Sequence, residues 1–205
     1  MSEVVGKTPN LIDIISLSGI HPLKIRNVYV FGSRVYGYNH EHSDFDILMI
    51  APNLEVHKEI KHPDYNIHIV NPDKFKSDVA SYKLQNLECI WAPAWAKLQE
   101  KEKINLEIVP DKVKKFFLAQ SYDTWHNAKM KFYDGDTVRG LKSAFHSLRA
   151  LLFGIHIIRE GKITDFSLAN GLYKSMYAED FYEWIQMKEK YLPLKQKLEE
   201  QLKKA

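Results

Sequence analysis

The stretch VYVFGSRVYGYNHEHSDFDILMI, residues 28–50, constrains the fold of this chain more than any other segment. Its first four and last four residues are apolar, and each run has the length of a buried strand. Between the runs lie a Gly32-Ser33 turn, room for a short helix over residues 34–37, and a polar segment that ends in Asp46. The pattern predicts two buried strands whose connection places the turn beside the polar head of the second strand.

Asp44 and Asp46 are two residues apart at the head of the second predicted strand. Residues at this spacing point to the same face of a strand. Two carboxylates on one face are unfavourable without a cation, and hard oxygen ligands suit Mg²⁺. The backbone N–H groups of a turn that starts a helix, here Gly32-Ser33, suit a phosphate. A phosphate cradle beside a divalent-metal site predicts nucleotidyl transfer.

The string Gly32-Ser33-Arg34-x-x-Gly37, followed by Ser43-Asp44-x-Asp46, resembles the nucleotidyltransferase superfamily typified by DNA polymerase beta. Within it, the string is similar to the small predicted nucleotidyltransferases of bacteria and phages. The resemblance implies that Gly32 and Ser33 hold the β- and γ-phosphates of a nucleoside triphosphate, which includes ATP. It also implies that Asp44 and Asp46 hold two Mg²⁺ ions.

Two residues beside these motifs are further candidates for nucleotide binding. Arg34 follows the phosphate turn and could pair with a phosphate bidentately, whereas the alternative is a surface ion pair. We also expect Ser43, which precedes the acidic pair, to bind the nucleotide.

The resemblance also implies a third carboxylate on a neighbouring strand, and this chain departs from that pattern. The corresponding strand is expected at residues 65–70, where Asn66 and His68 share a face and neither is acidic. Three interpretations are open: His68 acts as the catalytic base, Asp64 or Glu88 supplies the missing group, or the chemistry is weakened or lost. A half-buried histidine with no role in chemistry is the alternative for His68.

The period of the apolar residues changes near Val109 and divides the chain. Before it we expect a helix capped by Asn10 and ended by Gly19. Strands are expected at residues 25–31, 46–50, 54–61 and 65–70, then a helix after Asn71 and more helix over residues 84–95, interrupted at Pro93. After it we expect helices from Pro110 past residue 125, over 138–160, over 165–176, and over 180–203 with a kink or break at Pro193. The fold class is therefore α+β: a small mixed-sheet nucleotidyltransferase domain over residues 1–109, followed by an all-helical domain over residues 110–205.

A basic stripe lies on the second helix of the predicted helical domain. Lys142, His146 and Arg149 are spaced i, i+4, i+7 and share one face of that helix. The surrounding segment is similar to the helical half of the same predicted nucleotidyltransferases, so we expect the stripe to face the α/β domain and bind nucleotide. A solvated basic face is the alternative.

Composition limits the class of protein. The 205 residues are 45% hydrophobic, with a formal net charge of +3, which permits a nucleic-acid partner without requiring one. Cys89 is the only cysteine, which excludes an intrachain disulfide and a paired-cysteine metal site. No segment has the length and apolar character of a membrane span, so we expect a cytoplasmic protein in a reducing compartment.

Two functions follow from these observations. The first is a Mg²⁺-dependent nucleotidyltransferase that moves a nucleoside monophosphate from an NTP to an acceptor and releases pyrophosphate. The second is a catalytically degenerate module that binds a nucleotide or a protein partner, which the missing third acid favours. The acceptor (RNA, a protein or a small molecule), the preferred NTP and the oligomeric state are open at this level.

Overall fold

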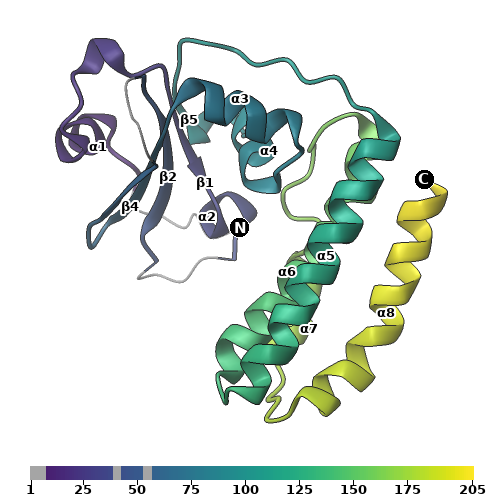
Figure 1. Ribbon diagram of the computed structural model, residues 1–205. Coiled ribbons are helices and arrows are strands. Elements are labelled where there is room, and N and C mark those ends of the chain that lie inside the picture. The colour runs from purple at the N-terminus through teal and green to yellow at the C-terminus, as the bar shows by residue number, and fades with distance from the viewer. Residues whose placement is uncertain (1–7, 39–42, 53–56) are drawn as a thin grey trace, which may run out of the picture. The chain divides into compact units, whose positions relative to one another are not determined.

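The structure is a computed structural model that describes residues 8–38, 43–52 and 57–205. The chain divides into two compact units, Met1–Leu106 and Glu107–Ala205. The first is built around a mixed sheet and the second is helical, so the predicted α+β fold class is confirmed (Figure 1).

The first unit contains one five-stranded sheet with strand order β3-β4-β2-β1-β5. The β2–β4 pair is parallel, and the β1–β2, β1–β5 and β3–β4 pairs are antiparallel. Both central strands are almost entirely buried, which explains why their sequences are continuous apolar runs. The strands are β1 (Asn27–Phe31), β2 (Phe45–Ile50), β3 (Lys58–Lys61), β4 (Tyr65–Val70) and β5 (Lys97–Glu100).

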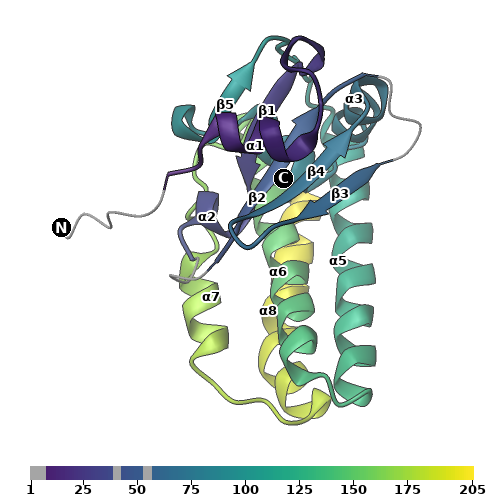
Figure 2. The same ribbon diagram turned by 90° about the vertical axis from the view of Figure 1, so that its left-hand side faces the viewer.

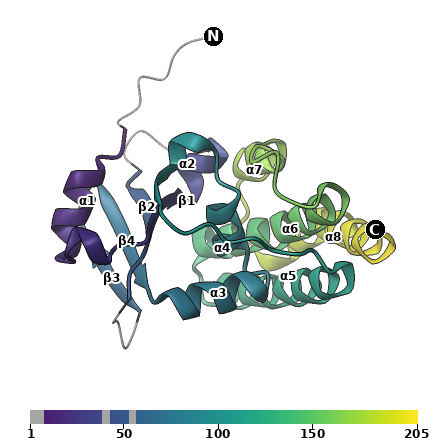
Figure 3. The same cartoon turned by 90° about the horizontal axis from the view of Figure 1, so that it is seen from above.

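Helices cover both faces of this sheet. Helix α1 (Leu11–Ser18) lies on one face, whereas α3 (Pro72–Ala80) and α4 (Leu84–Ile90) lie on the other (Figures 1 and 3). Asn10 accepts a hydrogen bond from the N–H of Ile12 and caps α1, and Gly19 ends it in the left-handed conformation, as predicted. The short helices η1 (Pro22–Lys24), α2 (Ser33–Tyr36) and η2 (Ala94–Ala96) complete the unit.

Two elements of the first unit differ from expectation. The strand expected over residues 54–61 is observed at Lys58–Lys61, and residues 53–56 lie outside the described part of the chain. The helix expected over residues 84–95 ends at Ile90, because Pro93 disfavours helical backbone at the residue before it. The chain then forms η2 and the edge strand β5, which the sequence pattern did not predict.

The helices of the second unit lie side by side, with α5, α6 and α8 running along one another (Figure 2). Helix α5 starts at a proline and α6 ends before Gly161, which has φ 74°, both as predicted. Asp136 caps the start of α6 by accepting from the N–H of Arg139, a cap that the sequence pattern did not predict. Ser121 and Ser147 form a buried contact between α5 and α6, with their hydroxyl oxygens 2.8 Å apart. The helices are α5 (Pro110–Tyr133), α6 (Thr137–Glu160), α7 (Asn170–Tyr177) and α8 (Trp184–Lys204).

The last two helices correct the expected boundaries. Helix α7 starts at Asn170 rather than near residue 165, because the Asp165 carboxylate accepts from the N–H and hydroxyl of Ser167 and holds a turn there. Helix α8 continues through Pro193 without a break. Buried residues before and after this proline, including Tyr191 and Leu198, anchor both halves of the helix. Among the described residues, no helix combines the length and the hydropathy needed to cross a bilayer.

Candidate active site

The predicted phosphate turn lies directly against Asp46. Gly32 has φ 77° and ψ −151°, a backbone conformation essentially restricted to glycine. A Cβ atom on Gly32 would be 2.6 Å from Oδ2 of Asp46. The absence of a side chain at Gly32 is therefore what allows the turn to approach the carboxylate, and Ser33 starts α2 at the same place.

The acidic pair lies at the beginning of β2. Asp46 is half-buried and stands between Phe31 of β1 and Asn66 of β4 in the register of the sheet. Asp44 is exposed and precedes the first residue of the strand. The sheet thus places one carboxylate beside the turn and leaves the other in contact with solvent.

Arg34 has partners that the sequence did not indicate. Its Nε donates to the carbonyl oxygen of Asp44 at 3.1 Å, and a terminal guanidinium nitrogen donates to the carbonyl oxygen of Ser43. The guanidinium carbon lies 3.9 Å from the centre of the Phe45 ring, in a cation–π contact. Arg34 therefore ties α2 to the backbone that carries the acidic pair.

Asn66 occupies the position in β4 next to Asp46. Its side-chain nitrogen lies 3.5 Å from Oδ1 of Asp46 and 3.1 Å from Nε2 of His68. Its side-chain oxygen is buried and has no hydrogen-bond partner among the described residues. A carboxylate at this position would add two anionic oxygens to the site, whereas the neutral amide of Asn66 adds none.

His68 is the second polar side chain on this face of β4, and both of its ring nitrogens have neighbours. Nε2 faces the amide nitrogen of Asn66, which is a donor, and Nδ1 lies 3.2 Å from Nε2 of His57. Because the amide nitrogen of Asn66 can only donate, Nε2 of His68 accepts in this contact and the proton of the neutral ring is on Nδ1. Burial lowers the pKa of His68, with smaller opposing and reinforcing effects from Glu59, His57 and Lys61.

The other candidates for the third carboxylate are placed differently. Asp64 receives a backbone hydrogen bond from the N–H of Phe45 at 2.8 Å, and Glu88 is buried in α4 with 3% of its surface exposed. The described residues contain no group of three His, Cys, Asp or Glu side chains arranged to hold a metal. Two carboxylates nevertheless fit Mg²⁺, which proteins commonly bind through one or two carboxylates together with substrate phosphates.

The basic stripe is present on α6, within the second unit. Lys142 is exposed, and His146 and Arg149 are half-buried. Burial lowers the pKa of His146 to about 3, and the charges of Arg149 and Lys142 contribute to the decrease. The stripe therefore carries two positive charges at neutral pH, because His146 is neutral.

Asn66 lies beside Asp46 although nothing in the sequence indicated it as the neighbour of that carboxylate. The signal that identifies it is the parallel register of β2 and β4, which pairs Asp46 with Asn66. A parallel pair cannot be aligned from a hairpin turn, so this register was not available from sequence alone.

Comparison with known proteins supports the assignment of the family. The sequence model described as a nucleotidyltransferase domain matches residues 16–131, which is more than half of the chain. A crystal structure of a nucleotidyltransferase-like protein from Exiguobacterium sibiricum is 11% identical, with a TM-score of 0.34, over 94% of this chain and 73% of that one. No curated protein is significantly similar to the chain. From the match to the family model, which includes the Gly-Ser turn and both aspartates, we conclude that this chain belongs to the nucleotidyltransferase domain family.

Proposed function

We propose that this protein is a Mg²⁺-dependent nucleotidyltransferase that transfers a nucleoside monophosphate from an NTP to an acceptor. The observation that carries the proposal is the close approach of the phosphate turn to Asp46, because a Cβ atom on Gly32 would touch the Asp46 carboxylate. Triphosphate and metal are needed at the same point for this reaction, and the turn and Asp46 meet at such a point.

Each residue of the site has a role in this proposal. Gly32 and Ser33 bind the β- and γ-phosphates, and Asp44 and Asp46 hold Mg²⁺, in one or two ions. Held by these carboxylates, Mg²⁺ would supply charge neutralisation for the triphosphate during in-line attack on the α-phosphate. The acceptor hydroxyl gives its proton to solvent and its oxygen bonds to the α-phosphorus. The bond from the α-phosphorus to the bridging oxygen breaks, and pyrophosphate leaves. Ser43, next to Asp44, remains a candidate for contact with the nucleotide.

The contacts of Arg34 and His68 favour positioning roles over those predicted from sequence. The Arg34 guanidinium group donates hydrogen bonds to the carbonyl oxygens of Ser43 and Asp44, so it fixes the backbone of the acidic pair. His68 has both ring nitrogens engaged, so it holds Asn66 beside Asp46 instead of acting as the base.

We further propose that Lys142 and Arg149 of the stripe supply cations to bound nucleotide or acceptor. His146, which is neutral, adds a polar contact and no charge.

A labelled-nucleotide assay tests the proposal. The chain is incubated with each of four NTPs labelled at the α-phosphate, with Mg²⁺, and with RNA or protein acceptors. Label transfer with equal release of pyrophosphate supports the proposal, and its loss in Asp46→Ala assigns the reaction to this site. Asn66→Asp is the informative companion, because a third carboxylate beside Asp46 should tighten Mg²⁺ binding.

The second candidate function is nucleotide binding without turnover. It is favoured by the amide of Asn66, which stands next to Asp46 where a carboxylate would complete a three-acid site. This candidate predicts that Mg²⁺-NTP binds, with Ser33→Ala weakening it by about 1 kcal/mol, whereas no NTP yields pyrophosphate.

A further inference from the structure

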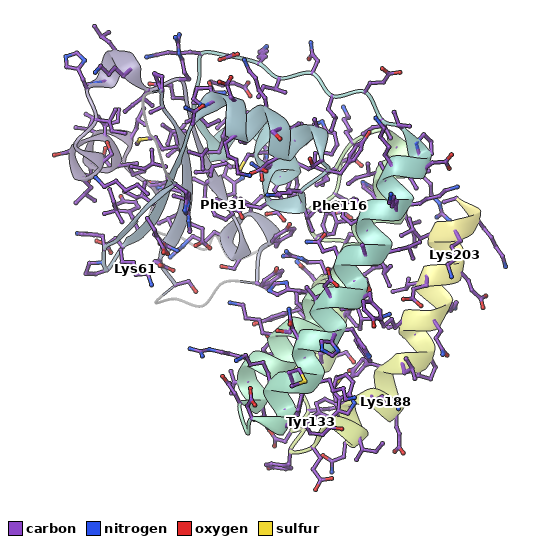
Figure 4. The ribbon with its side chains drawn as sticks, in the orientation of Figure 1. Phe31, Lys61, Phe116, Tyr133, Lys188 and Lys203 are labelled. Atoms are coloured by element: carbon purple, nitrogen blue, oxygen red, sulfur yellow. The ribbon has the colours of Figure 1, made fainter. Side chains whose placement is uncertain are left out.

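A groove lined by aromatic and basic side chains runs between the end of α5 and the start of α8 in the helical unit. It consists of two adjoining hollows, of about 200 and 420 Å³, which share Lys129, Trp184 and Lys188 as a common wall. Figure 4 labels Tyr133 and Lys188 near this end of the two helices. The groove is also lined by Tyr122, Trp125, His126, Tyr133 and Tyr182.

The groove has a rigid aromatic floor. Trp184 is 8% exposed and packs against Trp125 at 5.3 Å between ring centres, with the rings nearly perpendicular. The ring centre of Phe132 lies 6.1 Å from that of Trp184. These contacts fix the shape of the floor, so the groove does not depend on flexible side chains for its form.

The rim of the groove exposes flat aromatic surfaces. Tyr122, Tyr133 and Tyr182 have 68%, 66% and 74% of their surface in contact with solvent. On α5, Tyr122, His126, Lys129 and Tyr133 follow the spacing i, i+4, i+7, i+11 and form one stripe, roughly 16 Å long at the rise of an α-helix. The stripe thus begins and ends with an exposed tyrosine and carries His126 and Lys129 between them.

The charge of the groove is positive. Within the described part of the chain, neither Lys129 nor Lys188 forms an ion pair, and Nζ of Lys129 lies 5.6 Å from the centre of the Tyr133 ring. The acidic side chain in the lining, Glu183, accepts a backbone hydrogen bond as the cap of α8. Two unpaired cations beside exposed rings complement a ligand that is both anionic and planar.

We propose that this groove binds single-stranded nucleic acid, with bases stacked on the exposed tyrosines and phosphates near Lys129 and Lys188. Stacking platforms combined with a positive track are how proteins hold single strands without reading their sequence. An acidic peptide would use the two lysines but would leave the exposed rings without a matching partner. This inference rests on the proposed function in one respect: the strand bound in the groove would be the acceptor of the transferred nucleotide.

Fluorescence anisotropy with short labelled RNA and DNA strands tests this proposal on the full chain, without Mg²⁺ or NTP. In Lys129→Ala/Lys188→Ala we expect weaker binding and a salt slope, log K against log salt, reduced in magnitude by about 1.4 between about 50 and 200 mM KCl. In Tyr133→Ala/Tyr182→Ala we expect binding weakened about tenfold or more with the salt slope unchanged. The matched control is Lys197→Ala/Lys203→Ala, two exposed lysines of α8 outside the groove.

Binding of either strand with these variant effects supports the proposal, and the stronger of the two identifies the nucleic acid. Equal effects of the groove and control variants, or no binding by the wild type, would overturn it. Competition by a polyglutamate peptide, with no effect of the tyrosine changes, would instead assign the groove to acidic peptides. Because the assay measures binding alone, an Asp44→Ala chain that still binds the strand separates failure of the proposed transfer from failure of this proposal.

Discussion

Gly32→Ala is the substitution whose consequences the structure specifies most fully. The backbone at this position, with φ 77° and ψ −151°, is essentially restricted to glycine, so alanine costs about 1–3 kcal/mol in strain alone. The added Cβ would also be 2.6 Å from Oδ2 of Asp46, closer than van der Waals contact allows. For a unit of this size each kcal/mol lowers the unfolding midpoint by about 4–8 °C. We therefore expect scanning calorimetry to show a decrease of roughly 4 °C or more, together with loss of turnover.

A double variant separates the two causes of this effect. In an Asp46→Ala background the carboxylate oxygen is absent and the nearest remaining side-chain atom, Cβ of residue 46, is 3.5 Å away, which is an ordinary contact. Adding Gly32→Ala to that background should then cost less than in the wild type, by about 0.5 kcal/mol or more. The same cost in both backgrounds would refute the contact between the turn and the carboxylate.

Four further predictions concern single residues. Asp44→Ala should abolish Mg²⁺-dependent turnover while the midpoint temperature of thermal unfolding is unchanged or slightly raised. Wild-type turnover in this variant would exclude Asp44 as a metal ligand. Arg34→Lys, which removes the Nε donor and the planar fork, should lower kcat and raise the Mg²⁺ concentration needed for half-maximal rate, whereas a change in the KM for NTP alone would favour direct phosphate contact. Arg149→Ala should raise the KM for NTP or acceptor roughly tenfold, with Lys197→Ala as the neutral control, and parity between them would leave the α6 stripe without a role in the reaction. The pKa of His146 is lowered to about 3 in the folded chain, so between pH 6.5 and 3 only the unfolded chain takes up a proton at this residue. The free energy of unfolding should therefore fall with decreasing pH by up to about 1.4 kcal/mol per pH unit. His146→Gln should show a smaller decrease between pH 7.5 and 5, measured by thermal melting.

Local signals in the sequence predicted most of the fold. The caps at Asn10 and Gly19, the proline that starts α5 and the glycine that ends α6 each act through their own backbone, so they can be recognised without tertiary information. The apolar runs of β1 and β2 were recognisable for the same reason, because burial on both faces leaves little choice of residue.

The elements that were mispredicted depend on contacts that sequence patterns do not contain. Strand β5 is an edge strand of half-buried residues, and it exists because β1 offers an open side. Of the kink or break expected at Pro193, the break does not occur, because buried residues on both sides of the proline hold α8 against the unit. In each of these cases tertiary packing outweighs the local preference of the chain.

The candidate site divides in the same way. The closeness of Gly32 and Asp46 could be predicted because both residues lie within one connection of the sheet. The contacts of Arg34 could not, since its partners are backbone carbonyls, which any residue has. Asn66 and His68 were known to share a face, but the neighbour of Asp46 is set by the parallel register of β2 and β4.

The central claim is that the turn at Gly32-Ser33 and the carboxylates of Asp44 and Asp46 form one site for Mg²⁺-dependent nucleotidyl transfer. Its most direct test is the transfer of α-phosphate label from NTP, measured together with pyrophosphate, in the wild type and in Asp46→Ala, with and without EDTA. We expect label transfer matched by pyrophosphate in the wild type with Mg²⁺, and neither product in Asp46→Ala or after chelation. Undiminished transfer by Asp46→Ala, or transfer that survives removal of the metal, would contradict it.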